Sequence, residues 1–307
     1  MSKKPLISIL MNCFNGASYL KEALDSVIAQ SYSNWELIFW DNKSSDNSLD
    51  IVSLYKDKRI KIFVAEKHTN LGSARKSAFS KIKGEYLAFL DVDDYWYPEK
   101  LEKQIKVFSD NKVGISFTNT LFFSNKFQEN LYKPKSLNKV NTKSLITRYS
   151  LSLESIIINL NHLVKLDYAF DDKFNHICDF DLIVRLSCVS KVKYLDALLS
   201  GWRIHKNNES FKRKEIFNKE KLSWCDFHIK NKFFKTYINE IKELKMLVNA
   251  ERRIFNYSFS LLSLKSCLLA KTSNIKNKIF LILSFVPLFP KIIFQLKKFI
   301  FNSKWYY

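Results

Sequence analysis

The sequence has few cysteines, few glycines and no long hydrophobic run, and each shortage excludes a class of protein. Its five cysteines are odd in number and never form a Cys-x-x-Cys pair, which argues against a disulfide framework and a zinc knuckle and indicates a reducing compartment. Residues 12–16 are not the glycine-rich phosphate loop expected of a sugar nucleotidyltransferase. Residues 1–9 have too short an apolar stretch for a signal peptide, so we expect a bacterial cytoplasmic location.

Acidic residues are missing from the C-terminal part of the chain. From Ser258 onward there are eight lysines and no aspartate or glutamate, within a formal net charge of +20. The apolar run at residues 279–289 is interrupted by Pro287, and a membrane-spanning helix needs about twenty apolar residues. Apolar blocks between lysines, continuing to residue 301, are typical of a segment lying on the anionic inner face of the membrane. The alternative is a helix packed on the rest of the chain or on a second subunit.

The basic charge by itself also suggests a nucleic-acid partner. The sequence contains no recognised nucleic-acid module, and its C-terminal lysines cluster with apolar blocks instead of interleaving with stacking aromatics. We therefore expect no nucleic-acid partner.

Strand-like and helix-like segments alternate through the first hundred residues. Apolar runs predict strands at residues 6–11, 35–40, 60–65 and 86–90, with helices at about residues 18–30, 48–55 and 70–82 between them. Such alternation predicts an α/β fold with a doubly wound, mostly parallel sheet. Two further strands are expected at residues 192–195 and 198–204. The composition then becomes helical and rich in Lys and Phe, so we place a catalytic domain at residues 1–214 and a helical region at 215–307.

Three carboxylates follow the apolar run that ends at Leu90. Asp91, Asp93 and Asp94 would stand at the carboxyl end of the sheet, where open α/β sheets bind ligands. Like charges this close favour a bound cation, and oxygen ligands favour Mg²⁺ or Mn²⁺ shared with substrate phosphates. Asp91 and Asp93 point to the same side of an extended segment and form the better metal pair, whereas Asp94 would brace the turn. The alternative is a solvated turn that caps the following helix.

Two more residues stand at the same edge of the predicted sheet. A carboxylate at Asp41 can accept the imide N–H of uracil or thymine, although it can equally close an Asx turn. Arg75 can bind a nucleotide phosphate or base, or be an ordinary surface arginine.

Asp179 and Asp181 stand at the start of a predicted helix. A carboxylate at a helix N-terminus stays ionised and can act as a general base, while capping is the other interpretation and the one we prefer for Asp181. His205 ends a predicted strand and can bind a metal ion or a diphosphate, although a single histidine is usually structural.

Taken together, these segments resemble family-2 glycosyltransferases over roughly residues 5–210. Seven motifs occur in the expected order, at residues 7–15, 29–36, 41–46, 70–75, 91–101, 178–186 and 202–205. The resemblance implies a GT-A fold and an inverting, metal-dependent transfer of sugar from a nucleoside-diphosphate sugar. The carboxylate at Asp41 favours UDP or dTDP as the nucleotide, and GDP is open. It also implies a glycan or lipid-linked acceptor in the synthesis of a cell-surface polysaccharide such as lipopolysaccharide or capsule.

The resemblance implies a role for each matching residue. Asp41 would contact the base, Arg75 would lie near the nucleotide, and Asp91 and Asp93 would form the Asp-x-Asp pair, with Asp93 as the direct metal ligand. The remaining two matches are Asp179, which would be the catalytic base, and His205, which would lie near the metal and diphosphate.

The chain also departs from the family pattern. Cys178 stands where many relatives have glutamate before the base, and residues 12–15 and 42–45 differ from the usual loops, so donor identity is open. A catalytically silent scaffold in a membrane polysaccharide-assembly complex is the alternative, and a homo-oligomer is compatible with the sequence.

Overall fold

The computed structural model describes residues 4–132 and 140–256. The described residues form two compact units, one of residues 4–132, 140–142 and 150–204 and one of residues 143–149 and 205–256. The predicted boundary at residue 214 coincides with the start of a helix inside the second unit and stays a prediction.

The first unit is built on one nine-stranded sheet, with the strand order β3-β2-β1-β4-β8-β6-β9-β5 and β7 paired with β6. Its strands are β1 (Ile7–Cys13), β2 (Trp35–Asp41), β3 (Ile60–Val64), β4 (Tyr86–Phe89), β5 (Tyr95–Trp96), β6 (Val113–Ser124), β7 (Phe127–Asn130), β8 (Ile157–Asn159) and β9 (Lys191–Arg203). Its helices are α1 (Ala17–Ile28), α2 (Ser48–Ser53), α3 (Leu71–Phe79), α4 (Lys100–Ile105) and α6 (Cys178–Val189), with α5 (Thr142–Thr147) at the division between units.

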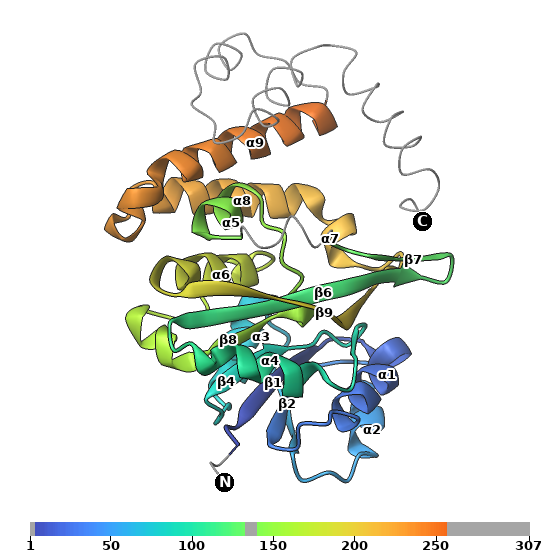
Figure 1. Ribbon diagram of the computed structural model, residues 1–307. Coiled ribbons are helices and arrows are strands. Elements are labelled where there is room, and N and C mark those ends of the chain that lie inside the picture. Colours follow the sequence, from blue (N-terminus) through green and yellow to red (C-terminus); the bar gives the residue numbers. More distant parts are fainter. Residues whose placement is uncertain (1–3, 133–139, 257–307) are drawn as a thin grey trace. The chain divides into compact units, whose positions relative to one another are not determined.

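The predicted parallel sheet is confirmed for the first four strands of this order, because β1 pairs in parallel with β2 and β4, and β2 with β3. The second half of the sheet is mixed. β8 is antiparallel to both β4 and β6, whereas the long strands β6 and β9 run parallel beside each other (Figure 1). β4, β6 and β9 therefore all point the same way as β1.

The expected pair of late strands is a single strand in the structure. β9 runs without a break from Lys191 to Arg203, and irregularities in its pairing with β6 fall at Thr118 and Asn119. An irregularity of this kind bends a strand without ending it, which explains why the local sequence reads as two segments.

Apolar side chains of the strands form the core on the two faces of the sheet. Ile9 in β1, Phe39 in β2 and Ala88 in β4 are fully buried, as expected for strands covered on both faces. Helix α3 packs on β1 and β2, and α6 packs on β6.

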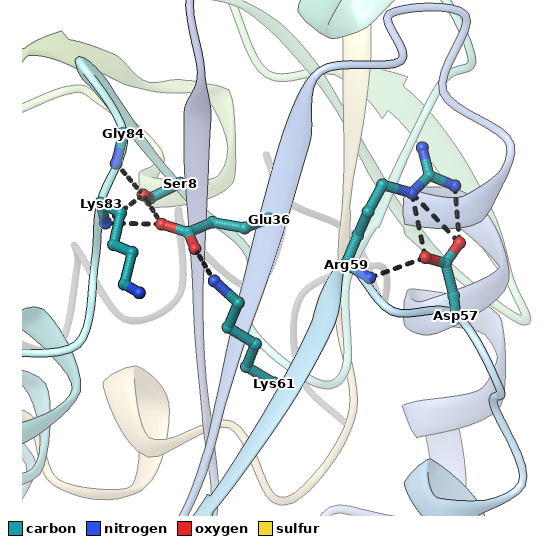
Figure 2. A network of polar contacts seen from close by, with 7 residues as sticks. All are labelled: Ser8, Glu36, Asp57, Arg59, Lys61, Lys83 and Gly84. Carbon is teal, nitrogen blue, oxygen red and sulfur yellow. Dashed lines mark hydrogen bonds and ion pairs between the residues drawn. The ribbon is translucent and has the colours of Figure 1, made fainter.

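A network of polar contacts connects the amino ends of three parallel strands (Figure 2). Glu36 of β2 accepts hydrogen bonds from Ser8 Oγ at 2.7 Å and from the backbone N–H of Lys83, and pairs with Lys61 of β3. Gly84 N–H donates to Ser8 Oγ at 2.8 Å. The network holds β1, β2 and β3 together with the turn before β4.

The second unit contains α7 (Glu209–Lys212), α8 (Lys214–His228) and α9 (Ile238–Asn256). Helices α8 and α9 pack on each other, and Arg252 pairs with Glu215 at 2.7 Å. Trp224, His228 and Phe234 form an aromatic cluster. Among the described residues, no helix is long and apolar enough to cross a membrane. The segment predicted to bind a membrane, residues 279–301, lies outside the described residues.

Candidate functional site

The loops after β1 and β2 are hydrogen-bonded to each other. Asn15 N–H donates to Ser44 Oγ at 2.9 Å, and Gly16 N–H donates to Ser48 Oγ at 3.0 Å. Asn15 and Lys43 both have positive φ, 55° and 70°, a conformation uncommon for residues other than glycine. The two loops therefore hold one defined shape at the carboxyl edge of the sheet.

Asp41 is the last residue of β2 and is fully buried. Its Oδ2 accepts the backbone N–H of Ser44, three residues on, at 3.0 Å, so the side chain closes the loop one residue further along than in the predicted Asx turn. Its Oδ1 is also buried and has no hydrogen-bond partner among the described residues. Because buried polar atoms are normally paired, this oxygen is an acceptor available to a ligand N–H.

Asn42 joins a third loop to this edge and was not singled out from the sequence. Its side-chain amide donates to the carbonyl of Thr69 at 2.7 Å, and its Oδ1 accepts the N–H of Thr69 at 3.2 Å. His68 in the same loop lies against Phe14, with ring centroids 4.1 Å apart. The one local indication was that Asn42 directly follows Asp41.

Arg75 is a buried link between two carboxylates that are far apart in the sequence. Its guanidinium lies 3.7 Å from Asp91 and 3.6 Å from Asp179, and donates to Cys178 Sγ at 3.2 Å. Arg75 is only 4% exposed, so the surface-arginine interpretation is wrong. Burial opposes the charged form, but Cys178, Asp91 and Asp179 together raise the pKa of Arg75, which stays a cation.

The surroundings of Arg75 shift the pKa values of two neighbouring groups, the thiol of Cys178 and the carboxyl of Asp91. Burial raises the pKa of Cys178 to about 11 despite the nearby cation, so the thiol stays neutral. The Asp91 side chain is 45% exposed, and its partial desolvation raises its pKa; Asp93 and Asp179 repel its negative form, whereas Arg75 stabilises it. The site therefore concentrates more negative charge than one arginine neutralises.

Asp93 and Asp94 differ in their surroundings. Asp94 is buried, and its Oδ1 accepts the backbone N–H of Arg203 at 2.9 Å, so it braces the turn against β9. Burial, with repulsion from Asp93 and Glu154, raises the pKa of Asp94 well above its usual value. Arg203 also donates from Nε to the carbonyl of Asp93 at 3.0 Å. Arg203 was not predicted to act here, although it lies within the last sequence motif.

Asp179 and Asp181 lie in the first turn of α6 but face different partners. Asp179 is partly exposed and contacts Arg75, whereas Asp181 is fully buried and binds Arg185 at 2.6 Å. The preferred interpretation of Asp181 as a helix cap is corrected: its carboxylate is occupied by a buried ion pair within the helix.

The structure thus brings Arg75, Asp91 and Asp179 together, with Asp93 next along the turn. His205 belongs to the second unit and accepts the N–H of Asn207 at Nδ1; its predicted place near a metal stays a prediction. No cluster of three or more His, Cys, Asp or Glu residues suited to a metal ion exists in the described part of the chain. Asp91 and Asp93 supply hard oxygen ligands, and Mg²⁺ usually takes only one or two carboxylates besides substrate phosphates.

Comparison with known families gives a match over half of the chain. The model of "Glycosyl transferase family 2" matches residues 8–165. An uncharacterized glycosyltransferase of Haemophilus influenzae is 30% identical over 62% of this chain and 74% of its own length.

Two further relatives carry more specific names. TuaG of Bacillus subtilis, named for teichuronic acid biosynthesis, is 37% identical over 38% of this chain and 46% of its own length. WfgD of Escherichia coli, named as a UDP-Glc:alpha-D-GlcNAc-diphosphoundecaprenol beta-1,3-glucosyltransferase, is 36% identical over 39% of this chain and 47% of its own length. The matched region spans about half the length of these two relatives.

Solved structures show the same fold at low identity. S. aureus TarS 1–349, in complex with UDP-GlcNAc, aligns with a TM-score of 0.61 at 19% identity over 94% of this chain and 83% of its own. The mannosyltransferase PcManGT of Pyrobaculum calidifontis, in complex with GDP-Man and Mn²⁺, aligns at 0.62 and 13% identity over 98% and 89%. The predicted GT-A fold is confirmed.

Proposed function

The chain belongs to glycosyl transferase family 2, and from this premise we propose that it moves a sugar from a nucleoside-diphosphate sugar to a hydroxyl of a glycan or lipid-linked acceptor. The observation that carries the proposal is the buried contact of Arg75 with both Asp91 and Asp179. Both carboxylates lie beside one cation, which supports the donor-side role proposed for Asp91 and the acceptor-side role proposed for Asp179. The names of TuaG and WfgD support an acceptor in cell-surface polysaccharide synthesis.

We assign the nucleotide base to the interlocked loops at the ends of β1 and β2. The unpartnered Oδ1 of Asp41 is an acceptor, and the imide N–H of uracil or thymine is a matching donor. UDP or dTDP is therefore favoured. The structure of TarS with UDP-GlcNAc supports this choice, whereas PcManGT with GDP-Man keeps GDP open.

A divalent cation, Mg²⁺ or Mn²⁺, fits the carboxylates that follow β4. Desolvation, together with repulsion from Asp93 and Asp179, raises the pKa of Asp91, and a bound cation would relieve that repulsion; both Asp91 and Asp93 offer carboxylate oxygens. Asp93, with Asp91, would hold the ion, and His205 is a further proposed ligand. When bound, the ion would stabilise the negative charge that develops on the departing nucleoside diphosphate.

Asp179 is the proposed general base in a single displacement with inversion. The acceptor oxygen attacks the anomeric carbon, the bond from that carbon to the diphosphate breaks, and the hydroxyl proton passes to Asp179. Asp179 lies in the first turn of α6, and Arg75, 3.6 Å from its carboxylate, holds it in position. Cys178, neutral and buried, occupies the preceding position without contributing charge.

The cell context of the proposal follows from the C-terminal lysines and apolar blocks. We propose that residues 279–301 hold the protein on the anionic inner face of the membrane, close to a lipid-linked acceptor.

A thermal-shift screen tests the donor site. The purified full-length chain is melted with UDP, dTDP, GDP and CDP, each with and without Mn²⁺. A ligand at 100 times its dissociation constant stabilises a protein that binds it only when folded by about 2.7 kcal/mol. We expect a metal-dependent shift with UDP or dTDP. The absence of a shift with all four nucleotides would contradict the proposal and favour the silent scaffold.

A further inference from the structure

A pocket lies in the first unit, at the opposite edge of the sheet from Asp41 and Asp91. It has a volume of about 540 Å³ and opens between the residues that precede β6, the end of α6 and the start of β9. Because β6 and β9 run parallel to β1, β2 and β4, their amino ends lie at the edge away from the proposed donor site. None of the family motifs includes this pocket.

The buried member of the pocket lining is His162, which is 8% exposed. Its Nε2 lies 3.0 Å from the carbonyl of Asn111, whereas its Nδ1 is buried and has no partner among the described residues. A Cβ on Gly114 would lie 3.3 Å from His162 Cγ and 2.1 Å from Ser190 Oγ, so glycine lets β6 pass directly behind the ring. The ring is thus held in place with one nitrogen unsatisfied.

The rest of the lining is basic. Lys112, Lys165 and Lys191 line the pocket, and no aspartate or glutamate does. Lys191 binds Asp110 at 3.2 Å and stands at the C-terminal end of α6, where a cation is favourable in any case. Lys191 therefore has a structural explanation. Lys112 and Lys165 come from two other segments and form no ion pair with any described residue.

Cys188 also lines the pocket but adds no charge. Its Sγ donates to the carbonyl of Val184 at 3.3 Å, and burial raises the pKa of the thiol to about 12. A neutral thiol is a poor nucleophile and a poor metal ligand. The pocket chemistry is therefore that of an anion site and not of a metal or thiolate site.

The hydrogen-bonding role of His162 Nδ1 limits which anions the pocket can bind. Since Nε2 donates to a carbonyl, the neutral ring leaves Nδ1 as an acceptor. A singly protonated phosphate has an O–H for that acceptor, and a dianionic phosphate can accept from Nδ1–H of the protonated ring, because the second phosphate pKa is about 6. Sulfate has no O–H to donate, so it can hydrogen-bond to Nδ1 only when the ring is protonated. The volume falls within the range of about 300–1,000 Å³ usual for small-molecule pockets, which leaves room for a group attached to the phosphate.

We propose that this pocket binds a small phosphate monoester, with Lys112 and Lys165 neutralising its charge and His162 Nδ1 hydrogen-bonded to a phosphate oxygen. The proposal does not depend on the proposed transferase activity, because the two sites share no residue.

Titration calorimetry on the full-length chain tests the proposal. Glucose 6-phosphate, inorganic phosphate and sulfate are titrated in EDTA, so that no divalent metal supports binding at the opposite edge. We expect both phosphates to bind one site and sulfate to bind more weakly. The double variant Lys112→Gln/Lys165→Gln and the variant His162→Gln, which keeps a donor toward Asn111, should each bind about tenfold more weakly or worse, since each loses a charge-assisted hydrogen bond.

Two control variants separate this site from its surroundings. Lys58→Gln removes an exposed lysine elsewhere on the unit, and Asp93→Asn changes the proposed donor site; both should bind glucose 6-phosphate like the unchanged protein. Melting curves check that every variant is folded. Failure of both phosphates to bind the unchanged chain, or full affinity in the double lysine variant, would overturn the proposal whatever the outcome of the nucleotide screen.

Discussion

At the scale of single residues, the candidate site depends on one arginine, Arg75, that contacts two carboxylates. Arg75 lies within 4 Å of both Asp91 and Asp179, which are separated by 88 positions in the sequence (179 − 91). Removing one partner from a buried charged group costs more than the pair itself contributes. Arg75 is therefore a positioning residue for both carboxylates, and the neutral thiol of Cys178 completes its contacts.

Replacing Asp179 with asparagine is expected to abolish most turnover while donor binding remains. General-base assistance typically contributes about 10² to 10⁴ in rate, and an amide cannot take the proton. The measurement is nucleoside-diphosphate release with donor and acceptor present, together with the thermal shift by nucleotide and Mn²⁺.

The matched control for this variant is Asp172→Asn, which changes an exposed aspartate that pairs with Lys76 on the surface. Its turnover should equal that of the unchanged protein. If Asp179→Asn kept full turnover, the assignment of the base would be wrong.

At the scale of elements, helix α3 is fixed to the segment before α6 by close contact. Asn70 caps the helix by accepting Ser73 N–H at 2.8 Å, and Leu71 N–H donates to Asn175 Oδ1 at 2.6 Å. A Cβ on Gly72 would lie 2.3 Å from the carbonyl oxygen of Phe174. The helix that carries Arg75 is thus held against the segment that leads into Asp179.

Gly72→Ala is therefore expected to destabilise the protein and to lower activity. Alanine favours a helix, so the loss comes from steric overlap with backbone, which typically costs about 1–3 kcal/mol. Urea unfolding and turnover measure the two effects. Ser73→Ala, in the same turn, is the control and should change neither; a Gly72→Ala protein as stable as the unchanged one would show that α3 is free to shift.

The network at the amino ends of β1, β2 and β3 predicts a pH dependence of stability (Figure 2). Burial raises the pKa of Glu36, but Lys61, Ser8 and the N–H of Lys83 outweigh it, so the pKa is lowered on folding. A group with a lowered folded pKa stabilises above its unfolded pKa, about 4.3 for glutamate, and this stability is lost as the pH falls through the folded value.

The free energy of unfolding should therefore fall more steeply for the unchanged protein than for Glu36→Gln as the pH is lowered below about 5. Near neutral pH the variant should be the less stable of the two. Urea titrations from about pH 3 to pH 7 measure both curves. Parallel curves would mean that Glu36 keeps its ordinary pKa in the folded protein.

At the scale of the whole molecule, the question is where the protein works in the cell. The lysines and apolar blocks of residues 279–301 predict attachment to an anionic membrane surface, each lysine near the surface contributing about 1 kcal/mol. Deleting residues 275–307 should move the protein from the membrane fraction to the supernatant, and high salt should weaken attachment of the full chain. Unchanged fractionation of the truncated chain would contradict this prediction.

The sequence alone determined the features that depend on neighbouring residues. Apolar runs and the polar residues directly after them located β1 to β4, and placed Asp41 and Asp91 at strand ends, because a buried strand and the loop that follows it are encoded within about ten residues. The start of α3 near residue 70 was located in the same way. The ordered motifs then indicated the family.

Only the tertiary structure decided the features that join distant segments. The antiparallel insertion of β8, the pairing of the continuous strand β9 with β6, and the contacts of Arg75 with Asp91 and Asp179 depend on which segments pack together. The pocket around His162 draws its lining from residues 111–112, 162–165 and 188–191, which no local pattern connects. Burial and pairing are properties of the packed chain, and so the charge state and the partners of these side chains appear only once the fold is formed.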